Sequence, residues 1–226
     1  MDPNYKYLYA TLLGLPPLCV ALALAGRLQR SAVVAGTILA LASPLSVLSE
    51  RLYWTPARLM GGGWGIEDII FCFHVGAMSW LCAVWPLGVK IKIGSIGAAA
   101  IKRLVMVCIA ATAVLVSLLA AHVPIMFAFV ATQAIIAAGL LLNRPSYARI
   151  AGFGAIVFTA YYFVLLSMWR LLMPNFMLMW DGSQIINATL MGVPFEEYLW
   201  VASIGIGFPL TIAFSLDARV ATDSVT

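Results

Sequence analysis

Two pairs of adjacent carboxylates each open an apolar run of the sequence. Glu67-Asp68 stands at the start of one run, and Glu196-Glu197 stands at the start of another near the opposite end of the chain. Burial in apolar surroundings favours the neutral form of a carboxyl group, whereas a helix N-terminus favours the charged form. A pair in such a place can therefore supply an acid and a base together, and the candidate catalytic residues are Glu67, Asp68, Glu196 and Glu197.

Aromatic residues accompany both acidic pairs. Phe71 follows Glu67 by four residues and Trp200 follows Glu196 by four, so each aromatic side chain would lie one helical turn beyond the first acid. Aromatic faces attract cations, and buried acids beside them suit a proton-initiated rearrangement of a polyene. The candidate substrate-binding residues are Trp54, Trp64, Phe71, Trp180, Tyr198 and Trp200.

The residues that flank the two pairs also repeat. Leu59-Met60-Gly61 precedes the first pair and Leu190-Met191-Gly192 precedes the second. Arg51-Leu52 and Arg170-Leu171 stand further upstream in the same order. A paired acid with the same flanks twice is more specific than a short apolar match, and it predicts that the chain contains two related halves. Gly65, Gly192 and Pro194 are the candidate structural residues of the two motifs.

The composition places the chain in a membrane. Hydrophobic residues make up 63% of the 226 residues and charged residues 10%, and the mean hydropathy is 1.01. One soluble core cannot bury that much apolar surface. The net charge of +4 is spread over the loops without a basic tract, so we expect no nucleic-acid partner. We expect no metal site either, because His74 near the first pair lacks further ligands.

Apolar windows of about 20 residues, each long enough to cross a bilayer, recur along the chain. They predict an all-α integral membrane fold of about seven transmembrane helices, near residues 7–26, 32–48, 66–86, 101–120, 124–142, 150–173 and 194–215. Most basic loop residues then fall on the side of the C-terminus. We therefore expect a cell-membrane protein with its N-terminus outside and its C-terminus in the cytoplasm.

The doubled motif predicts a parallel repeat within one polytopic domain, residues 1–226. Residues 1–86 would form the first three-helix repeat, and residues 124–215 the second. Residues 101–120 would form the joining helix that restores the chain direction, and residues 216–226 a short polar tail. Both acidic pairs would then lie on one side of the membrane and converge on one elongated apolar site at the repeat interface.

The sequence resembles the small membrane-embedded lycopene cyclase domain family, which occurs as heterodimeric cyclases and as single fused chains. The family's Pro-x-Glu-Glu-x-x-aromatic motif is matched by residues 194–200, Pro-Phe-Glu-Glu-Tyr-Leu-Trp. The first half departs from it, with Gly65 in place of the proline and Asp68 in place of the second glutamate. Trp200 stands where the family usually has phenylalanine.

This resemblance implies a cofactor-independent cyclase that acts on a linear carotenoid or another hydrophobic isoprenoid. An acid would protonate the terminal double bond, the next double bond would attack the cation, and a base would remove a proton to leave a ring. The resemblance implies no cofactor, and the sequence carries no G-x-G-x-x-G or P-loop motif. The bilayer, a second copy of the chain and other enzymes of the same pathway are the expected partners.

Other interpretations of the same residues remain open at this stage. The acids could be solvated residues at helix N-termini, and the tryptophans could form an interfacial belt. A proton-coupled carrier also uses membrane carboxylates, although such acids are expected near mid-span. An intramembrane protease would need an arginine or histidine partner set, and a non-catalytic scaffold would tolerate neutral replacements of the acids.

Overall fold

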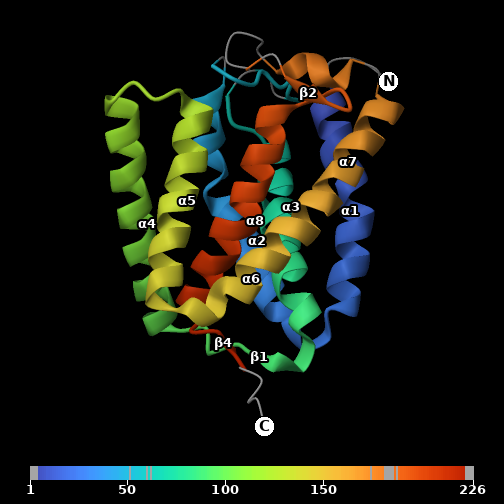
Figure 1. The fold of residues 1–226 in the computed structure, drawn as a ribbon. Coiled ribbons are helices and arrows are strands. Elements are labelled where there is room, and N and C mark those ends of the chain that lie inside the picture. The colour runs from blue at the N-terminus through green and yellow to red at the C-terminus, as the bar shows by residue number, and fades with distance from the viewer. Residues whose placement is uncertain are drawn as a thin grey trace. The chain divides into compact units, whose positions relative to one another are not determined.

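The computed structural model describes residues 5–50, 52–59, 61, 63–173, 175–180, 186 and 188–221. Arg51 and Met60 of the repeated flanks lie outside the described residues, as does the end of the predicted polar tail. The α-helices are α1 (Lys6–Leu24), α2 (Gln29–Leu41), α3 (Ile66–Val84), α4 (Ala98–Ala120), α5 (Ile125–Asn143), α6 (Ala148–Phe153), α7 (Thr159–Leu172) and α8 (Phe195–Ser215) (Figure 1). The strands are β1 (Ile91–Lys92), β2 (Thr189–Leu190), β3 (Val193–Pro194) and β4 (Arg219–Val220).

The predicted all-α membrane fold is confirmed. Within the described residues, six helices are long and apolar enough to cross a membrane, and the number rises to seven if one bent pair forms a single span. The bent pair corresponds to the predicted span 32–48, which is not one straight helix. Gly26–Leu41 is followed by the 3-10 helix Ser43–Ser49 at an angle of 44°. Pro44 at the start of the second segment cannot donate a backbone hydrogen bond, which explains the break.

The sixth predicted span is longer than expected and has an irregular centre. It begins at Pro145 rather than at residue 150, and it continues to Leu172. Between α6 and α7 the backbone widens into a π-helical turn over Gly154–Phe158. Such turns shift the register of the side chains that follow and are often found near functional sites.

The described chain divides into two compact units, which do not coincide with the predicted repeats. The first unit comprises residues 1–78 and 160–199, and the second comprises residues 79–159 and 200–226. Both acidic pairs belong to the first unit. The predicted superposition of residues 1–86 on residues 124–215 stays a prediction.

Small residues bring the helices of the first unit into close contact. A side chain at Gly14 in α1 would collide with the ring of His74 in α3. A side chain at Gly36 in α2 would come within 2.8 Å of the carbonyl oxygen of Phe73, and one at Gly76 within 2.8 Å of that of Ala35. Close backbone approach at small residues is typical of helix pairs in membranes. These contacts hold α3, whose first turn carries two of the acids, against α1 and α2.

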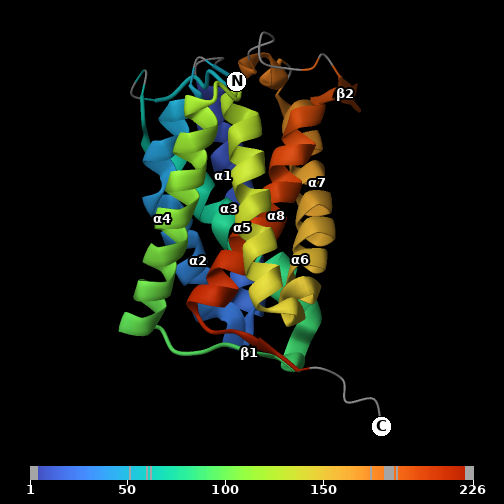
Figure 2. The same cartoon turned by 60° about the vertical axis from the view of Figure 1, so that its left-hand side comes forward.

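In the second unit, α4 and α5 run side by side in both views (Figures 1 and 2). Antiparallel pairing of β1 with β4 ties the segment after α3 to the segment after α8, with Ile91 opposite Val220. Arg144 forms an ion pair of 2.6 Å with Asp217 beside this strand pair. The fully buried hydroxyl of Tyr147 lies 3.1 Å from the carbonyl oxygen of Ala213. These contacts fasten the end of α8.

Candidate functional site

Each acidic pair occupies the first turn of a helix, as the sequence predicts. Glu67 and Asp68 begin α3, and Glu196 and Glu197 begin α8 directly after the β2–β3 hairpin. All four side chains are buried, with exposed fractions of 0%, 1%, 0% and 5% in that order. This burial contradicts the interpretation of the acids as solvated residues at helix ends. Four buried acids require specific compensation, and their hydrogen bonds show what supplies it.

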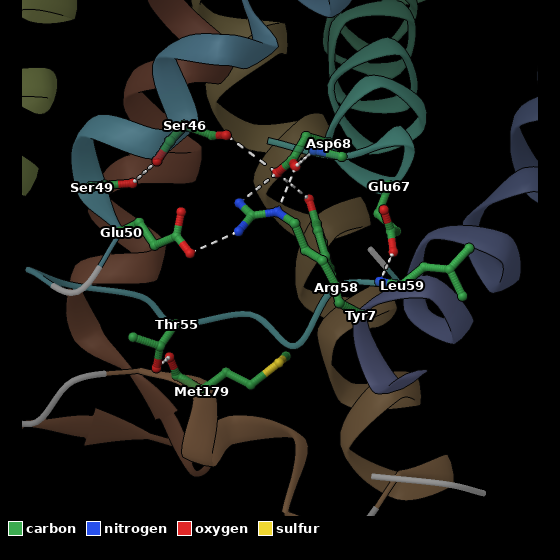
Figure 3. Close-up of polar contacts among 11 residues, drawn as sticks. Tyr7, Ser46, Ser49, Glu50, Thr55, Arg58, Leu59, Glu67, Asp68 and Met179 are labelled. Atoms are coloured by element: carbon green, nitrogen blue, oxygen red, sulfur yellow. Dashed lines mark hydrogen bonds and ion pairs between the residues drawn. The ribbon is translucent and has the colours of Figure 1, made fainter. Parts of the chain in front are cut away.

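Asp68 is surrounded by donors (Figure 3). Arg58 binds it in bidentate fashion, with Nε 2.7 Å from Oδ2 and Nη2 3.1 Å from Oδ1. The hydroxyls of Tyr7 and Ser46 each donate to Oδ1 at 3.2 Å. The backbone N–H of Gly65 donates to Oδ2 at 2.8 Å, so Asp68 also caps the N-terminus of its own helix.

Arg58 connects Asp68 to the loop before α3. Its Nη1 lies 3.0 Å from the carboxylate of Glu50, and its guanidinium carbon lies 5.9 Å from the centroid of the Trp54 ring. Burial opposes the charge of Arg58, but the hydrogen bond to Asp68 and the attraction of both carboxylates outweigh it and raise the pKa of Arg58. The guanidinium therefore stays charged and holds Glu50 and residues 52–59 against the start of α3.

Glu197 has a different set of partners. The phenol of Tyr53 donates to its Oε1 at 2.7 Å, and the indole N–H of Trp180 donates to the same oxygen at 2.5 Å. Burial raises the pKa of Tyr53, and the neighbouring Glu197 raises it further, so the phenol remains a donor. Tyr53 comes from the loop before the first acidic pair and reaches an acid of the second pair.

The loops that precede the two pairs pack against each other. Trp54 and Trp180 form an antiparallel bridge, and the Thr55 N–H donates to the carbonyl oxygen of Met179 at 2.7 Å. The Thr55 hydroxyl reaches the same oxygen at 3.2 Å (Figure 3). This contact brings the surroundings of both acidic pairs together within the first unit.

Glu67 and Glu196, the first acids of the two pairs, share one arrangement. Oε1 of Glu67 accepts the Leu59 N–H at 2.6 Å (Figure 3), and Oε1 of Glu196 accepts the Ile186 N–H. The second oxygen of each, Oε2, is buried and has no hydrogen-bond partner among the described residues. A buried carboxyl oxygen without a hydrogen-bond partner costs less free energy when its group is neutral than when it is charged.

Buried and half-buried aromatic rings lie near the acids, and each ring contacts the next in a closed loop. Its consecutive ring centroids lie 4.9 to 6.5 Å apart, mostly edge to face or tilted, which are the favourable geometries. In order around this loop, which we call the aromatic ring cluster, the residues are Tyr7, Trp54, Trp180, Phe176, Trp169 and Phe71. Through Trp180, this cluster reaches Glu197, and through Tyr7 it reaches Asp68.

The predicted aromatic residues fall into two groups. Trp54, Phe71 and Trp180 belong to the aromatic ring cluster. Trp64 lies apart from it, 49% exposed, and donates its indole N–H to the Ser43 hydroxyl at 2.8 Å.

The two remaining predicted aromatic residues follow the second acidic pair. Tyr198 packs on Phe163 and donates to the carbonyl oxygen of Leu190 at 2.9 Å. Trp200 is half-buried and belongs to the second unit.

The three predicted structural residues each occupy a turn or a close contact. Gly65 lies against Glu67, where an added Cβ would come within 2.6 Å of Oε2. Gly192 has a φ of 75° in the β2–β3 turn, a conformation that favours glycine. Pro194 is buried in β3, opposite Thr189. The hairpin leads directly into the first turn of α8.

Sequence reasoning missed several residues of this region. Tyr7, Trp169 and Phe176 stand in apolar stretches with no local pattern that distinguishes them. Tyr53 and Arg58 carried a weak signal, because they lie in the tryptophan-containing loop just before the first acidic pair. In the sequence, Arg58 is one of several basic loop residues, which bear only on the predicted topology.

His74 is also buried in this unit, two turns after Glu67. Its Nε2 lies 2.5 Å from the Tyr161 hydroxyl. Among the described residues, no group of three or more His, Cys, Asp or Glu side chains is arranged to hold a metal ion.

The fold and this site define a helical membrane protein with two buried acidic pairs beside a cluster of aromatic rings. Residues 121–214 match the family model described as lycopene cyclase, which confirms the resemblance to the lycopene cyclase family over the second half of the chain. The match includes Glu196 and Glu197. It begins at residue 121, so it does not include Glu67 and Asp68. No curated protein matches the chain. No solved structure matches it either.

Proposed function

We propose that the chain is a carotenoid cyclase that closes the end group of a linear polyene by acid–base catalysis. One observation carries this proposal. The first acid of each pair is buried, accepts a backbone N–H through one oxygen, and has no hydrogen-bond partner among the described residues at its other oxygen. A buried carboxyl group with an oxygen left over in this way is suited to present a proton to an apolar substrate. The family match at residues 121–214 supports the same substrate class.

The reaction we propose conserves atoms and electrons. A protonated carboxyl group, Glu196 or Glu67, adds its proton to the terminal carbon–carbon double bond and leaves a tertiary carbocation. The π electrons of a double bond further along the chain form the new ring bond, and the positive charge moves to a ring carbon. A carboxylate then removes a proton beside that carbon and restores a double bond. The product is an isomer of the substrate.

The surroundings support the charged intermediate. Aromatic faces stabilise a nearby cation, by about 2 kcal/mol or more when water is excluded. Trp180 donates to Glu197 and belongs to the aromatic ring cluster, so its orientation is fixed beside the acid. We propose Glu197 as the base for the final proton removal, and Trp54, Phe71 and Trp180 as the residues that face the end group.

Expression of the chain in a host that accumulates lycopene tests this function. Chromatography of the extracted pigments should reveal cyclic carotenoids. Glu196→Gln and Glu197→Gln, made separately, should each lower the rate on the order of a hundredfold or more, which is typical for loss of a general acid or base. Asp217→Asn in the second unit is the matched control, because it also neutralises one acid but lies outside the site.

The same experiment separates the proposal from its rivals. A non-catalytic scaffold predicts no cyclic carotenoid in this host, either from the unaltered chain or from any variant. If Glu196→Gln, Glu197→Gln and Glu67→Gln all retain full activity, acid–base catalysis by these residues is wrong. If the unaltered chain leaves lycopene linear, lycopene cyclisation is wrong as the function. A different substrate or a carrier function would then be the better proposal.

We also propose that the chain lies in the cell membrane with its N-terminus outside. The distribution of basic loop residues supports this orientation. A fluorescent protein that matures only in the cytoplasm should fluoresce when fused to the C-terminus. If the fusion protein is present at full length but does not fluoresce, the C-terminus lies outside and the proposed orientation is wrong.

A further inference from the structure

The second acids of the two pairs, Asp68 and Glu197, are held in chemically different ways. Asp68 accepts from a bidentate guanidinium, two hydroxyls and one backbone N–H. The hydrogen bonds to Glu197 in the described part of the chain come from a phenol and an indole, both of them neutral. The sequence motif alone makes the two positions look equivalent.

The donors around Asp68 use its full capacity to accept hydrogen bonds. A carboxylate offers about four lone-pair positions on its two oxygens. Five donors point at Asp68, two of them from the fork of Arg58. A proton added to Asp68 would displace one of these donors and leave the guanidinium without its counter-charge. Because both partners are buried, breaking the pair in this way is strongly unfavourable.

Among the described residues, no cation binds the carboxyl group of Glu197. Its two described donors share one oxygen, Oε1, and neither carries a charge. Adding a proton to Glu197 therefore leaves no buried cation behind, and removing it leaves a carboxylate that Tyr53 and Trp180 still stabilise. Both protonation states of Glu197 are compatible with its surroundings.

We propose that the two acidic pairs have different roles: Glu196–Glu197 exchanges the proton, whereas Asp68 is a permanent carboxylate that acts as a positioning residue. This inference rests on the proposed function. Asp68 and Arg58 together anchor Glu50 and residues 52–59 to the first turn of α3. That loop in turn delivers the Tyr53 phenol to Glu197 and the Leu59 N–H to Glu67. The ion pair thus arranges the reacting acids without exchanging protons.

Infrared difference spectroscopy of the purified protein tests this division directly, with a readout that does not depend on turnover. The protein is titrated in detergent from acid to alkaline pH, and the C=O stretch of protonated carboxyl groups is followed. A titrating carboxyl band should disappear in Glu197→Gln. It should still be present in the double variant Arg58→Gln/Asp68→Asn, which removes both charges of the buried pair together and so avoids an unpaired ion.

Loss of that band in Arg58→Gln/Asp68→Asn, together with its persistence in Glu197→Gln, would overturn the proposal. If the double variant does not accumulate in the membrane, the single variant Arg58→Lys is used in its place. It retains a cation but lacks the bidentate fork, so a titrating Asp68 would shift its band and a permanent carboxylate would not. The cyclisation assay is then run on the same proteins. Correct infrared bands without cyclic product would count against the proposed function alone, and cyclic product with an Asp68 band would count against this inference alone.

The kinetic comparison gives a second readout. The double variant is expected to lower kcat through looser placement of Tyr53, and both limbs of the pH–rate profile should remain. Removal of a group that exchanges the proton would abolish one limb. Loss of a limb in the double variant therefore contradicts a positioning role for Asp68.

Discussion

The phenol of Tyr53 donates a hydrogen bond of 2.7 Å to the carboxylate of Glu197, a residue 144 positions further along the chain. Tyr53 is itself buried and has a raised pKa, so it stays protonated while it holds the acid. The first half of the chain thereby supplies part of the surroundings of the acidic pair in the second half. A motif that appears local in the sequence depends on a loop from the other motif.

Tyr53→Phe is expected to lower kcat/KM for cyclisation by about tenfold to a hundredfold. The substitution keeps the ring but removes one of two donors to Glu197, and a hydrogen bond to a charged group typically contributes about 1.5–3 kcal/mol. Steady-state kinetics in detergent measure the effect. Tyr9→Phe is the matched control, since it removes a phenol hydroxyl from α1 for which no hydrogen bond to a described residue is observed. Equal activity of the two variants would show that Glu197 does not need Tyr53.

Gly65→Ala should impair the first acidic pair specifically. The new Cβ would lie 2.6 Å from Oε2 of Glu67 and 3.3 Å from Cδ of Arg58, so the carboxylate or the loop has to shift. We expect lower activity if Glu67 takes part in the reaction, because its carboxylate has to leave the position in which it accepts the Leu59 N–H. Ile66→Ala is a suitable neighbour control because the Ile66 side chain is 49% exposed. Full activity in Gly65→Ala would contradict a role for Glu67 in the reaction.

The sequence predicts the elements of this fold well because apolar windows report burial in the bilayer directly. The first turns of α3 and α8, with their acids, lie where the motif indicates. The break before Ser43–Ser49 was missed because the apolar window continues across Pro44. Hydropathy averages over a window, whereas a single proline changes the backbone hydrogen bonding at one position.

The partners of the acids could not be predicted in the same way. Arg58 looks like an ordinary loop cation, and Tyr7 looks like an ordinary residue of an apolar helix. Their roles arise from contacts across 10 and 61 positions of the chain. The equivalence of Asp68 and Glu197 in the motif was likewise misleading, because side chains from other elements decide which acid is paired with a cation.

Lowering the pH should loosen the end of α8 through Asp217. The hydrogen bond from Arg144 lowers the pKa of Asp217 below its ordinary value of 3.8. Because the folded-state pKa is the lower one, the stabilisation is fully present above that ordinary value and is lost as the pH falls through the folded-state pKa. Asp217→Asn should remove this dependence. Thermal unfolding of the unaltered chain and of Asp217→Asn, in detergent at a series of acidic pH values, measures this dependence. If the melting temperatures of the two proteins fall in parallel with pH, the role of Asp217 is contradicted. The effect should be small, because the pair is partly exposed.

The tight packing of Gly154 on Gly205 gives the sharpest test of the fold in the second unit. A Cβ added at Gly154 would collide with the carbonyl oxygen of Gly205, and one at Gly205 would lie 2.5 Å from the carbonyl oxygen of Gly154. Backbone atoms cannot move aside as a flexible side chain can, so Gly154→Ala should separate the π-helical turn from α8. We expect a loss of about 1–3 kcal/mol in the free energy of unfolding.

Gly152→Ala is the matched control for this last prediction. It makes the same chemical change two residues earlier, where nothing lies within 4 Å of the added Cβ. Alanine is more favourable than glycine within a helix by about 1 kcal/mol. This variant should therefore unfold at the same temperature as the unaltered chain or at a higher one. Thermal unfolding in one detergent compares the two. If Gly154→Ala proves as stable as Gly152→Ala, the backbone contact between Gly154 and Gly205 does not exist in the folded protein.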